Sequence, residues 1–179
     1  MKEPANLEEI YATFGSMVYN LALSYVQNRE EAEEITQDVF LQVHFKIKSF
    51  KGASSLSTWI YRIGINKSLD FIKAKQRKKR FAMLTSLFYE DSNTIKHDAE
   101  DFDHPGIQME QKEAMERLFS HINQLPDKQK TALILTKIEQ KTQNEAGEIM
   151  QLSSKAIESL IQRAKTNLDK KIKADKGIY

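Results

Sequence analysis

The sequence predicts an all-α protein made of two helical units joined by an acidic linker. Only 6 Gly and 3 Pro occur in 179 residues, and so few breakers favour long helices over a sheet fold rich in turns. Apolar residues recur at helical spacing on both sides of residues 89–106, which are acidic and poor in large aliphatic side chains. We therefore place an N-terminal helical bundle at residues 1–82, a flexible acidic linker at 83–108 and a helix-turn-helix unit at 109–179.

The first two helices of the bundle are predicted from apolar stripes and a capping signal. Phe14, Val18 and Leu21 belong to a stripe that predicts a helix over residues 7–26. Asn28 is the expected N-cap of the next helix, and Glu31 is placed to reach back to it three residues later. This second helix should run to about residue 48, with its acidic residues crowded into the first turns, where the helix dipole favours them.

A third helix is expected after a short loop. Residues 49–55 contain Gly52 and clustered serines, which break both the helical and the strand periodicity. Ser57 or Thr58 can cap a helix over about residues 58–80. Three helices with short connections form a compact bundle.

The second unit is predicted to end in a helix-turn-helix. Its first helix should cover residues 107–123, and Pro126 is well placed in the first turn of the next helix. A short helix over residues 143–150, a break at 151–153 and a long helix from Ser154 complete the unit. A short helix, a tight turn and a longer helix with a polar outer face are typical of this DNA-binding motif.

Charge is distributed in blocks, although the net charge is only +2. An acidic block at residues 30–38 is followed by a basic block at 73–80, by the acidic linker and by a basic C-terminal stretch. Such alternation favours separate surfaces for separate partners. The simpler interpretation is that these runs are solvated helix faces.

Several classes of function are excluded or disfavoured by composition. The chain has no Cys, so disulfides, thiolate zinc sites and cysteine nucleophiles are absent. Its four His lack ligand spacing, and no P-loop or nucleophile elbow occurs, so we expect no metal, no cofactor and no enzymatic activity. Without an apolar run of about 20 residues, no membrane insertion is expected, and the chain should be cytoplasmic.

Two stretches resemble a known family. Residues 30–73 carry an acidic A-E-E-I-x-Q-D-V-F-L helix, an F-x-G-x-S-S loop and T-W-I-Y-R-I-x-x-N; residues 125–168 carry L-P, S-x-x-A-I-E-S and R-A-K-x-x-L. In order and spacing they are similar to the two domains of extracytoplasmic-function sigma factors, of the sigma-70 family. Four positions depart from that pattern: His44 for Trp, Gln143 for an aromatic residue, Gly147 for Ala, and Gln151 at a turn where Gly is common.

The resemblance implies a surface that binds core RNA polymerase. The acidic helix is similar to the family surface that grips the clamp helices of the largest polymerase subunit, where carboxylates and amides pair with basic side chains around an apolar anchor. Four residues are the candidates: Glu34, Gln37, Asp38 and Leu41. The alternative is a solvated face whose charges only support the helix start.

The resemblance also implies a surface that captures a flipped base of the minus-ten promoter element. A polar pocket beside an aromatic platform can hold an unstacked base. The candidates in the loop and the next helix are Phe50, Lys51, Gly52, Ser54, Ser55, Arg62, Asn66 and Lys67. Trp59 shares the apolar stripe of its neighbours and is interpreted as a core residue.

Two further sets of residues are expected to contact DNA. The basic run should bind the phosphate backbone with steep salt dependence, and its members are Lys73, Lys75, Arg77, Lys78, Lys79 and Arg80. The last helix should enter the major groove of the minus-thirty-five element and read base edges and phosphates. Its candidates are Ser154, Lys155, Glu158, Ser159, Gln162, Arg163 and Lys165.

The resulting hypothesis is a sigma factor, a monomer when free, that binds core RNA polymerase and directs promoter-specific initiation. The family further implies an anti-sigma factor as a regulatory partner. Two alternatives remain open from the residues. One is a stand-alone helix-turn-helix regulator, which should bind a duplex operator by itself, as a dimer on a palindrome. The other is a sigma-like decoy that binds polymerase or an anti-sigma factor without reading promoters.

Overall fold

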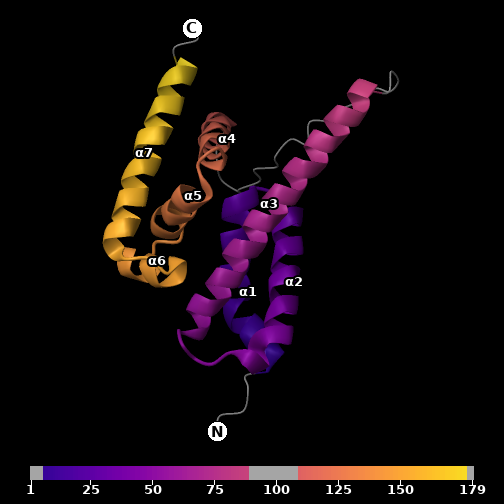
Figure 1. The fold of residues 1–179 in the computed structure, drawn as a ribbon, viewed down its shortest axis with the longest axis vertical. Coiled ribbons are helices and arrows are strands. Elements are labelled where there is room, and N and C mark those ends of the chain that lie inside the picture. Colours follow the sequence, from indigo (N-terminus) through magenta and orange to yellow (C-terminus); the bar gives the residue numbers. More distant parts are fainter. Residues whose placement is uncertain (1–5, 89–108, 177–179) are drawn as a thin grey trace.

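The computed structural model describes residues 6–88 and 109–176, with side chains described for 6–83 and 113–176. Its first unit contains α1 (Leu7–Val26), α2 (Arg29–Lys46), a single 3-10 turn η1 (Ile47–Ser49) and α3 (Leu56–Phe88). The three helices lie side by side, and α3 projects beyond the other two (Figure 1). The predicted three-helix bundle is confirmed.

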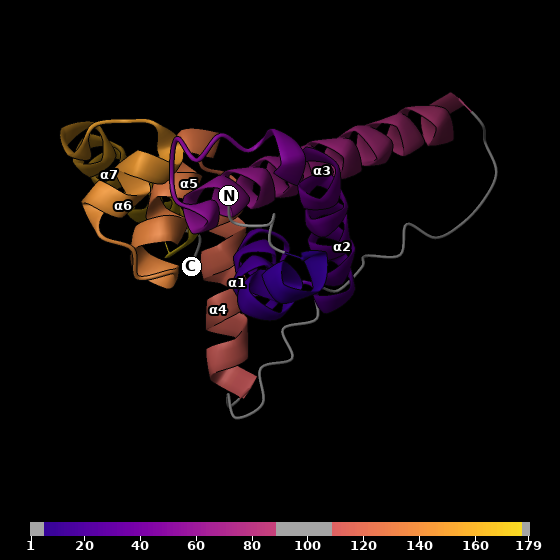
Figure 2. The ribbon, with the colours of Figure 1, turned by 90° about the horizontal axis from the view of Figure 1, so that it is seen from below.

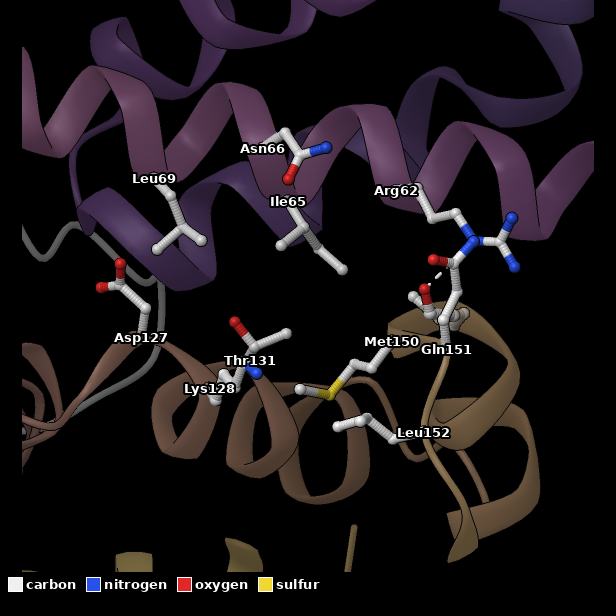
Figure 3. Close-up of a pocket in the computed structure, with 11 residues that line it drawn as sticks. Arg62, Ile65, Asn66, Leu69, Asp127, Lys128, Thr131, Met150, Gln151 and Leu152 are labelled. Carbon is white, nitrogen blue, oxygen red and sulfur yellow. Dashed lines mark hydrogen bonds between the residues drawn. The ribbon is translucent and has the colours of Figure 1, made fainter. Parts of the chain in front are cut away.

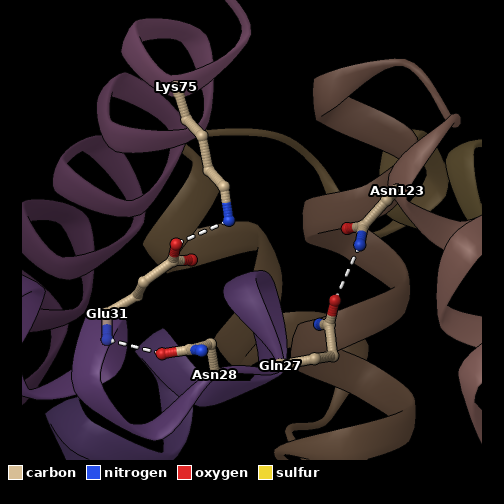
Figure 4. A network of polar contacts seen from close by, with 5 residues as sticks. All are labelled: Gln27, Asn28, Glu31, Lys75 and Asn123. Atoms are coloured by element: carbon tan, nitrogen blue, oxygen red, sulfur yellow. Dashed lines mark hydrogen bonds and ion pairs between the residues drawn. The ribbon is translucent and has the colours of Figure 1, made fainter. Parts of the chain in front are cut away.

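The ends of these helices differ in part from the predictions. Asn28 caps α2 as expected, because its Oδ1 accepts a hydrogen bond from the backbone N–H of Glu31 at 2.9 Å. The Glu31 carboxylate, however, pairs with Lys75 Nζ at 2.5 Å (Figure 4). The cap of α3 is Ser55, whose hydroxyl accepts from the backbone N–H of Thr58 at 3.0 Å; neither Ser57 nor Thr58 plays that role.

Helix α3 also continues to Phe88, eight residues past its predicted end and into the predicted linker. Residues 78–88 include basic and apolar side chains without Gly or Pro, and such residues sustain a helix once it has started. The acidic part of the predicted linker, residues 89–108, lies outside the described residues.

The second unit consists of α4 (Met109–Asn123), α5 (Asp127–Leu133), a π-helical turn η2 (Ile134–Ile138), α6 (Gln143–Met150) and α7 (Ser154–Lys176). All four predicted helices are confirmed, and Pro126 directly precedes α5. The π turn was not predicted, and it closes with a hydrogen bond from the Glu139 N–H to the Ile134 carbonyl at 2.9 Å. Across the described ranges 6–88 and 109–176, no strand occurs.

The turn between α6 and α7 accommodates two of the departures from the family pattern. Gln151 adopts the left-handed conformation, with φ 57° and ψ 44°, where Gly is usually favoured. The Leu152 N–H then donates to the Gly147 carbonyl at 2.9 Å. A Cβ on residue 147 would lie 2.6 Å from the Leu152 carbonyl oxygen, so this close approach requires glycine.

The hydrophobic core is continuous across the two units. Buried side chains of the bundle pack in one cluster with Ile134, Leu135 and Ile149 of the second unit, and a smaller cluster joins α4, α5 and α7. Figure 2 shows the second unit beside α1 and α3, with α7 on its outer side; α6 contacts α3, and the π-helical turn η2 contacts α1. The two units therefore contact each other directly, beyond the tethering expected of a linker.

Candidate nucleic-acid and partner interfaces

The predicted polymerase-binding residues lie together on the outer face of α2. Glu34, Gln37, Asp38 and Leu41 are all exposed, with Leu41 at 57%. The opposite face of α2, with Ile35, Val39 and Val43, is buried. Asp38 forms an ion pair with Lys67 of α3, with 3.2 Å between Oδ2 and Nζ, but the Asp38 side chain remains 55% exposed.

One apolar residue of this face was missed. Phe45 lies one turn after Leu41 and is 78% exposed, with its ring edge-on to His44 at 5.5 Å between centroids. Exposed large apolar side chains at this spacing are unusual on a monomeric surface and indicate a partner. The signal was present in the sequence, because Leu41 and Phe45 are four residues apart and both lie off the buried stripe of α2.

A groove of about 740 Å³ adjoins this face, between α1 and α2. Its lining includes Tyr11, Gly15 and Tyr19 of α1, together with Glu33 and Gln37 of α2. The Tyr11 ring is held edge-on against Phe40, with 4.7 Å between centroids. The groove thus extends the acidic face of α2 with aromatic walls.

The loop before α3 presents an aromatic pair. The rings of Phe50 and Trp59 lie 5.1 Å apart at 37°, so Trp59, a partly buried residue packed against the core as predicted, also supports Phe50. Lys51 and Gly52 are exposed, and Gly52 has φ +69°. The Ser55 hydroxyl is engaged with Thr58, at 2.9 Å from its Oγ1. Ser54 lies in the same loop, and its hydroxyl bonds the Ser55 carbonyl at 3.3 Å.

Further along α3, two of the three predicted minus-ten residues are engaged in contacts within the protein. The Arg62 guanidinium donates to two carbonyls at the end of α6, Glu148 at 2.8 Å and Ile149 at 3.1 Å. Asn66 is exposed, and it lines with Arg62 a cleft of about 380 Å³ between the two units (Figure 3). The amine of Lys67 is held by Asp38.

The basic run on α3 is exposed, and part of it is paired. Lys73 binds Asp127 at the start of α5 at 2.9 Å, and this hydrogen bond raises the pKa of the Lys73 ammonium. Lys75 binds Glu31. The remaining members are exposed to solvent, as a phosphate-binding surface requires: Arg77, Lys78, Lys79 and Arg80.

The predicted reading face of α7 is open. The buried side of this helix carries Ile157, Ile161 and Ala164. The Ser154 hydroxyl bonds the Asn144 side chain and is partly covered. The other candidates are exposed along the outer side: Lys155, Glu158, Ser159, Gln162, Arg163 and Lys165.

Polar contacts between the two units were not predicted. The buried Tyr25 hydroxyl bonds Thr131 Oγ1 at 2.8 Å, and Asn123 Nδ2 donates to Gln27 Oε1 at 2.6 Å; Figure 4 shows the second of these. Burial of Tyr25 raises the pKa of its phenol. No periodicity or motif signals such pairs, because each joins residues about a hundred positions apart.

Three titratable groups near this contact have pKa values shifted by burial. The Tyr61 hydroxyl donates to Glu139 Oε2 at 3.1 Å, and burial raises the pKa of both groups. Lys130 is only 2% exposed, and burial lowers the pKa of its amine. Perturbed groups of this kind also occur in structural contacts, and here they lie beside the contact between the units.

No cluster of metal-ligating side chains is present in the described part of the chain. His121 pairs with Asp175 at 2.9 Å, which ties α4 to the end of α7. None of the described helices is long and apolar enough to cross a membrane.

Comparison with known proteins identifies relatives of both units. The sigma-70 region 2 family profile matches residues 10–78, and the sigma-70, region 4 profile matches residues 115–168. RNA polymerase sigma-H factor of Pseudomonas aeruginosa is 28% identical over 156 residues, covering 86% of this chain and 79% of its own. The ECF RNA polymerase sigma factor SigM of Bacillus subtilis is 26% identical over 164 residues, covering 90% and 92%.

Two solved structures share the fold. CnrH, determined in complex with the cytosolic domain of CnrY, has a TM-score of 0.62 at 21% identity, with 94% of this chain and 88% of that chain covered. The sigma factor RpoE of Bartonella quintana, determined with the anti-sigma factor NepR, has a TM-score of 0.59 at 20% identity, with 94% and 97% covered.

Proposed function

The chain belongs to the sigma-70 family of RNA polymerase sigma factors, of the extracytoplasmic-function type, and we propose how its surfaces divide the work of promoter-directed initiation. The observation that carries the proposal is the separation of three exposed surfaces on one fold. They are the acidic and apolar face of α2, the aromatic loop with the basic side of α3, and the polar side of α7.

Core RNA polymerase docks on α2. Glu34, Gln37 and Asp38 supply acidic and amide groups, and Leu41 with Phe45 supplies an apolar anchor that is exposed in the free chain. An apolar centre surrounded by charged groups is typical of specific protein interfaces. Charge complementarity would speed the encounter with a basic partner helix.

The minus-ten element is captured at the loop before α3. The Phe50–Trp59 pair offers an aromatic surface for an unstacked base, worth about 1–3 kcal/mol of stacking. Lys51, next to Phe50, and Asn66, further along α3, are both exposed. The basic run from Lys73 to Arg80 holds the phosphate backbone. No ATP-driven step is needed, because base capture itself offsets the cost of unpairing.

The minus-thirty-five element is read by α7. The turn that sets this helix is well formed, since Gly147 and Gln151 satisfy its geometry, although both depart from the family pattern. This geometry favours promoter reading over a decoy function. Base discrimination would come from the exposed side of α7, between Lys155 and Lys165.

We infer a cytoplasmic, non-enzymatic protein whose regulatory partner is an anti-sigma factor. Support for the partner comes from the solved relatives, which are described with the cytosolic domain of CnrY and with the anti-sigma factor NepR. An anti-sigma factor covering α2 would block docking directly.

Promoter-specific transcription in vitro tests the proposal. The chain is added to core polymerase with a library of promoter fragments, and we expect initiation from a defined subset that depends on the chain. Polymerase binding without initiation would support the decoy, and specific duplex binding without polymerase would support the stand-alone regulator.

A further inference from the structure

The groove between α1 and α2 has two tyrosines and a glycine in a row on its α1 side. Tyr11, Gly15 and Tyr19 line the groove and follow one another at intervals of four residues, so they share one side of the helix. A Cβ on Gly15 would have the Tyr11 ring as its nearest neighbour, at an ordinary 3.6 Å. The glycine is therefore not required by a close backbone approach, and its effect is to leave space between the two rings.

The α2 side of the groove supplies hydrogen-bond acceptors. Glu33 and Gln37, again four residues apart, are exposed there, and the other polar residues that complete the lining are Ser16, Asn20 and Thr36. Glu33 forms no ion pair with any residue whose side chain the structure describes. The described lining therefore combines an available carboxylate with aromatic walls, without a basic side chain.

The carboxylate and one of the rings lie at the same end of the groove. Helices α1 and α2 are joined by two residues and run antiparallel. Tyr11 packs against Phe40, and Glu33 precedes Phe40 by seven residues, about 10 Å along α2. The other end of the α1 row, at Tyr19, therefore lies toward Glu33.

A cationic side chain fits this lining better than an anion or an apolar group. A guanidinium carries five N–H donors and an ammonium three, and neither has an acceptor, so each is satisfied by carboxylate, amide and hydroxyl oxygens. A cation is also attracted to the face of a tyrosine ring. An anion would meet the Glu33 carboxylate without a basic partner, and an apolar group would strip water from that carboxylate without replacing its hydrogen bonds.

The groove is continuous with the docking face of α2, because Gln37 belongs to both. Glu33 and Leu41 are eight residues apart, about 12 Å along the helix, a span that a few turns of one partner helix cover. We propose that this groove receives an arginine or lysine side chain of core RNA polymerase, from the segment that docks on α2. The inference rests on the proposed docking function and gives it a second contact, separate from the Asp38 charge.

A photo-crosslinker placed in the groove of the full-length chain tests the contact. The chain has no native Cys, so Ser16→Cys, at an exposed residue of the lining, is labelled specifically with benzophenone maleimide. Leu41→Cys reports the docking face, and Glu9→Cys, exposed on α1 outside the lining, reports the background. With core polymerase, we expect Ser16→Cys to crosslink well above that background, to the same subunit as Leu41→Cys and at a peptide that contains Arg or Lys.

Removing the charge of the groove should weaken polymerase binding. Glu33→Gln keeps the shape of the side chain, and we expect the Kd for core polymerase to rise about fivefold, because the basic side chain loses its charged partner. Glu9→Gln, which removes an exposed carboxylate of α1 outside the groove, should leave the Kd unchanged. The difference between the wild-type chain and Glu33→Gln should shrink at high salt, because salt screens the attraction between exposed charges.

Tyr11 allows a contact with the ring to be separated from a contact with the hydroxyl group. Tyr11→Leu removes a ring that is 53% exposed in the free chain, whereas Tyr11→Phe retains its face. We expect the Kd for core polymerase to rise about fivefold in Tyr11→Leu and less than about twofold in Tyr11→Phe. Circular dichroism and urea unfolding establish that each variant is folded.

Three results would overturn the groove contact. One is crosslinking from Leu41→Cys without crosslinking from Ser16→Cys, and another is an unchanged Kd in folded Glu33→Gln and Tyr11→Leu. The third is a Ser16→Cys crosslink to a second copy of the chain in place of polymerase. In each case, polymerase binding by the wild-type chain leaves docking on α2 standing, whereas no polymerase binding by the wild-type chain would contradict the proposed function itself.

Discussion

At Gly147, the choice of residue follows from the backbone of the turn after α6. A methyl group there would lie 2.6 Å from the Leu152 carbonyl oxygen, whereas at Gly15 on α1 it would meet the Tyr11 ring at an ordinary 3.6 Å. Helix propensity alone favours Ala at both positions by about 1 kcal/mol. An added methyl group is thus accommodated at Gly15 but not at Gly147, although both glycines lie in helices. Only the tertiary contact with Leu152 distinguishes the two positions.

Gly147→Ala is expected to destabilise the chain by about 1–3 kcal/mol, because the turn must shift to admit the methyl group. Gly15→Ala, the matched control, should be neutral or stabilising. Urea unfolding followed by circular dichroism measures both. Equal effects of the same sign would contradict the close approach at the turn.

Lys130 is a second residue whose effect on the stability of the fold is set by its surroundings, in this case by burial. Its side chain is 2% exposed, and burial lowers the pKa of its amine. The pKa of this lysine is lower in the folded protein than in the unfolded chain. The free energy of unfolding is therefore highest above the pKa of the unfolded chain, and it decreases as the pH falls from there toward the pKa of the folded protein. At neutral pH, which lies below the pKa of an unfolded lysine, burial of this amine therefore opposes folding.

Lys130→Met should raise the free energy of unfolding by about 1–3 kcal/mol at pH 7, with a smaller gain at pH 10. Lys128→Met, on the exposed side of the same helix, should leave stability unchanged at both pH values. Unfolding titrations at the two pH values make the comparison. A gain of the same size for both variants, or a larger gain at pH 10, would argue against a buried charge at residue 130.

Among the helices, α2 and α3 show which features of a helix the apolar spacing in the sequence predicts. In α2, Ile35, Val39 and Val43 form the buried side at intervals of four residues, and the residues proposed for docking, which the family resemblance implies, lie on the exposed side. Phe45 was overlooked, although its position off that stripe was visible. For α3, the periodicity predicted the helix but not its end, because residues 81–88 carry no breaker.

Phe45→Ala should weaken core-polymerase binding about tenfold or more, as expected for a central apolar anchor, without lowering stability. Phe81→Ala, which removes an aromatic ring that is 70% exposed on α3, is the control outside this face. Binding is measured with labelled chain and core polymerase. Equal losses for the two variants would remove Phe45 from the docking surface.

Helix α7 allows a separate test of promoter reading. Replacing Lys155 and Gln162 by Ala should alter which minus-thirty-five sequences are selected from a promoter library, since each good base contact discriminates by about 1–3 kcal/mol. Lys170→Ala, beyond the reading face, should leave the preference unchanged. An unaltered preference in the double variant would exclude this side of α7 as the reader.

At the scale of the whole molecule, the division into two helical units was predictable and their contact was not. Both units have their own periodic stripes and capping signals, which are local. The contact depends on Tyr25 meeting Thr131 and Arg62 meeting the end of α6, pairs with no local signature. The structure thereby adds a direct contact between the units to a chain in which the sequence predicts only two tethered units.

Binding of core RNA polymerase by the purified chain, titrated at low salt, tests the central claim most directly. We expect saturable one-to-one binding that weakens about tenfold or more in Asp38→Lys and is unchanged in Asp169→Lys, which reverses an exposed charge on α7. The exposed Asp38–Lys67 pair contributes little to folding, so both variants should remain folded. No binding by the wild-type chain, or equal binding by the two variants, would contradict docking through α2.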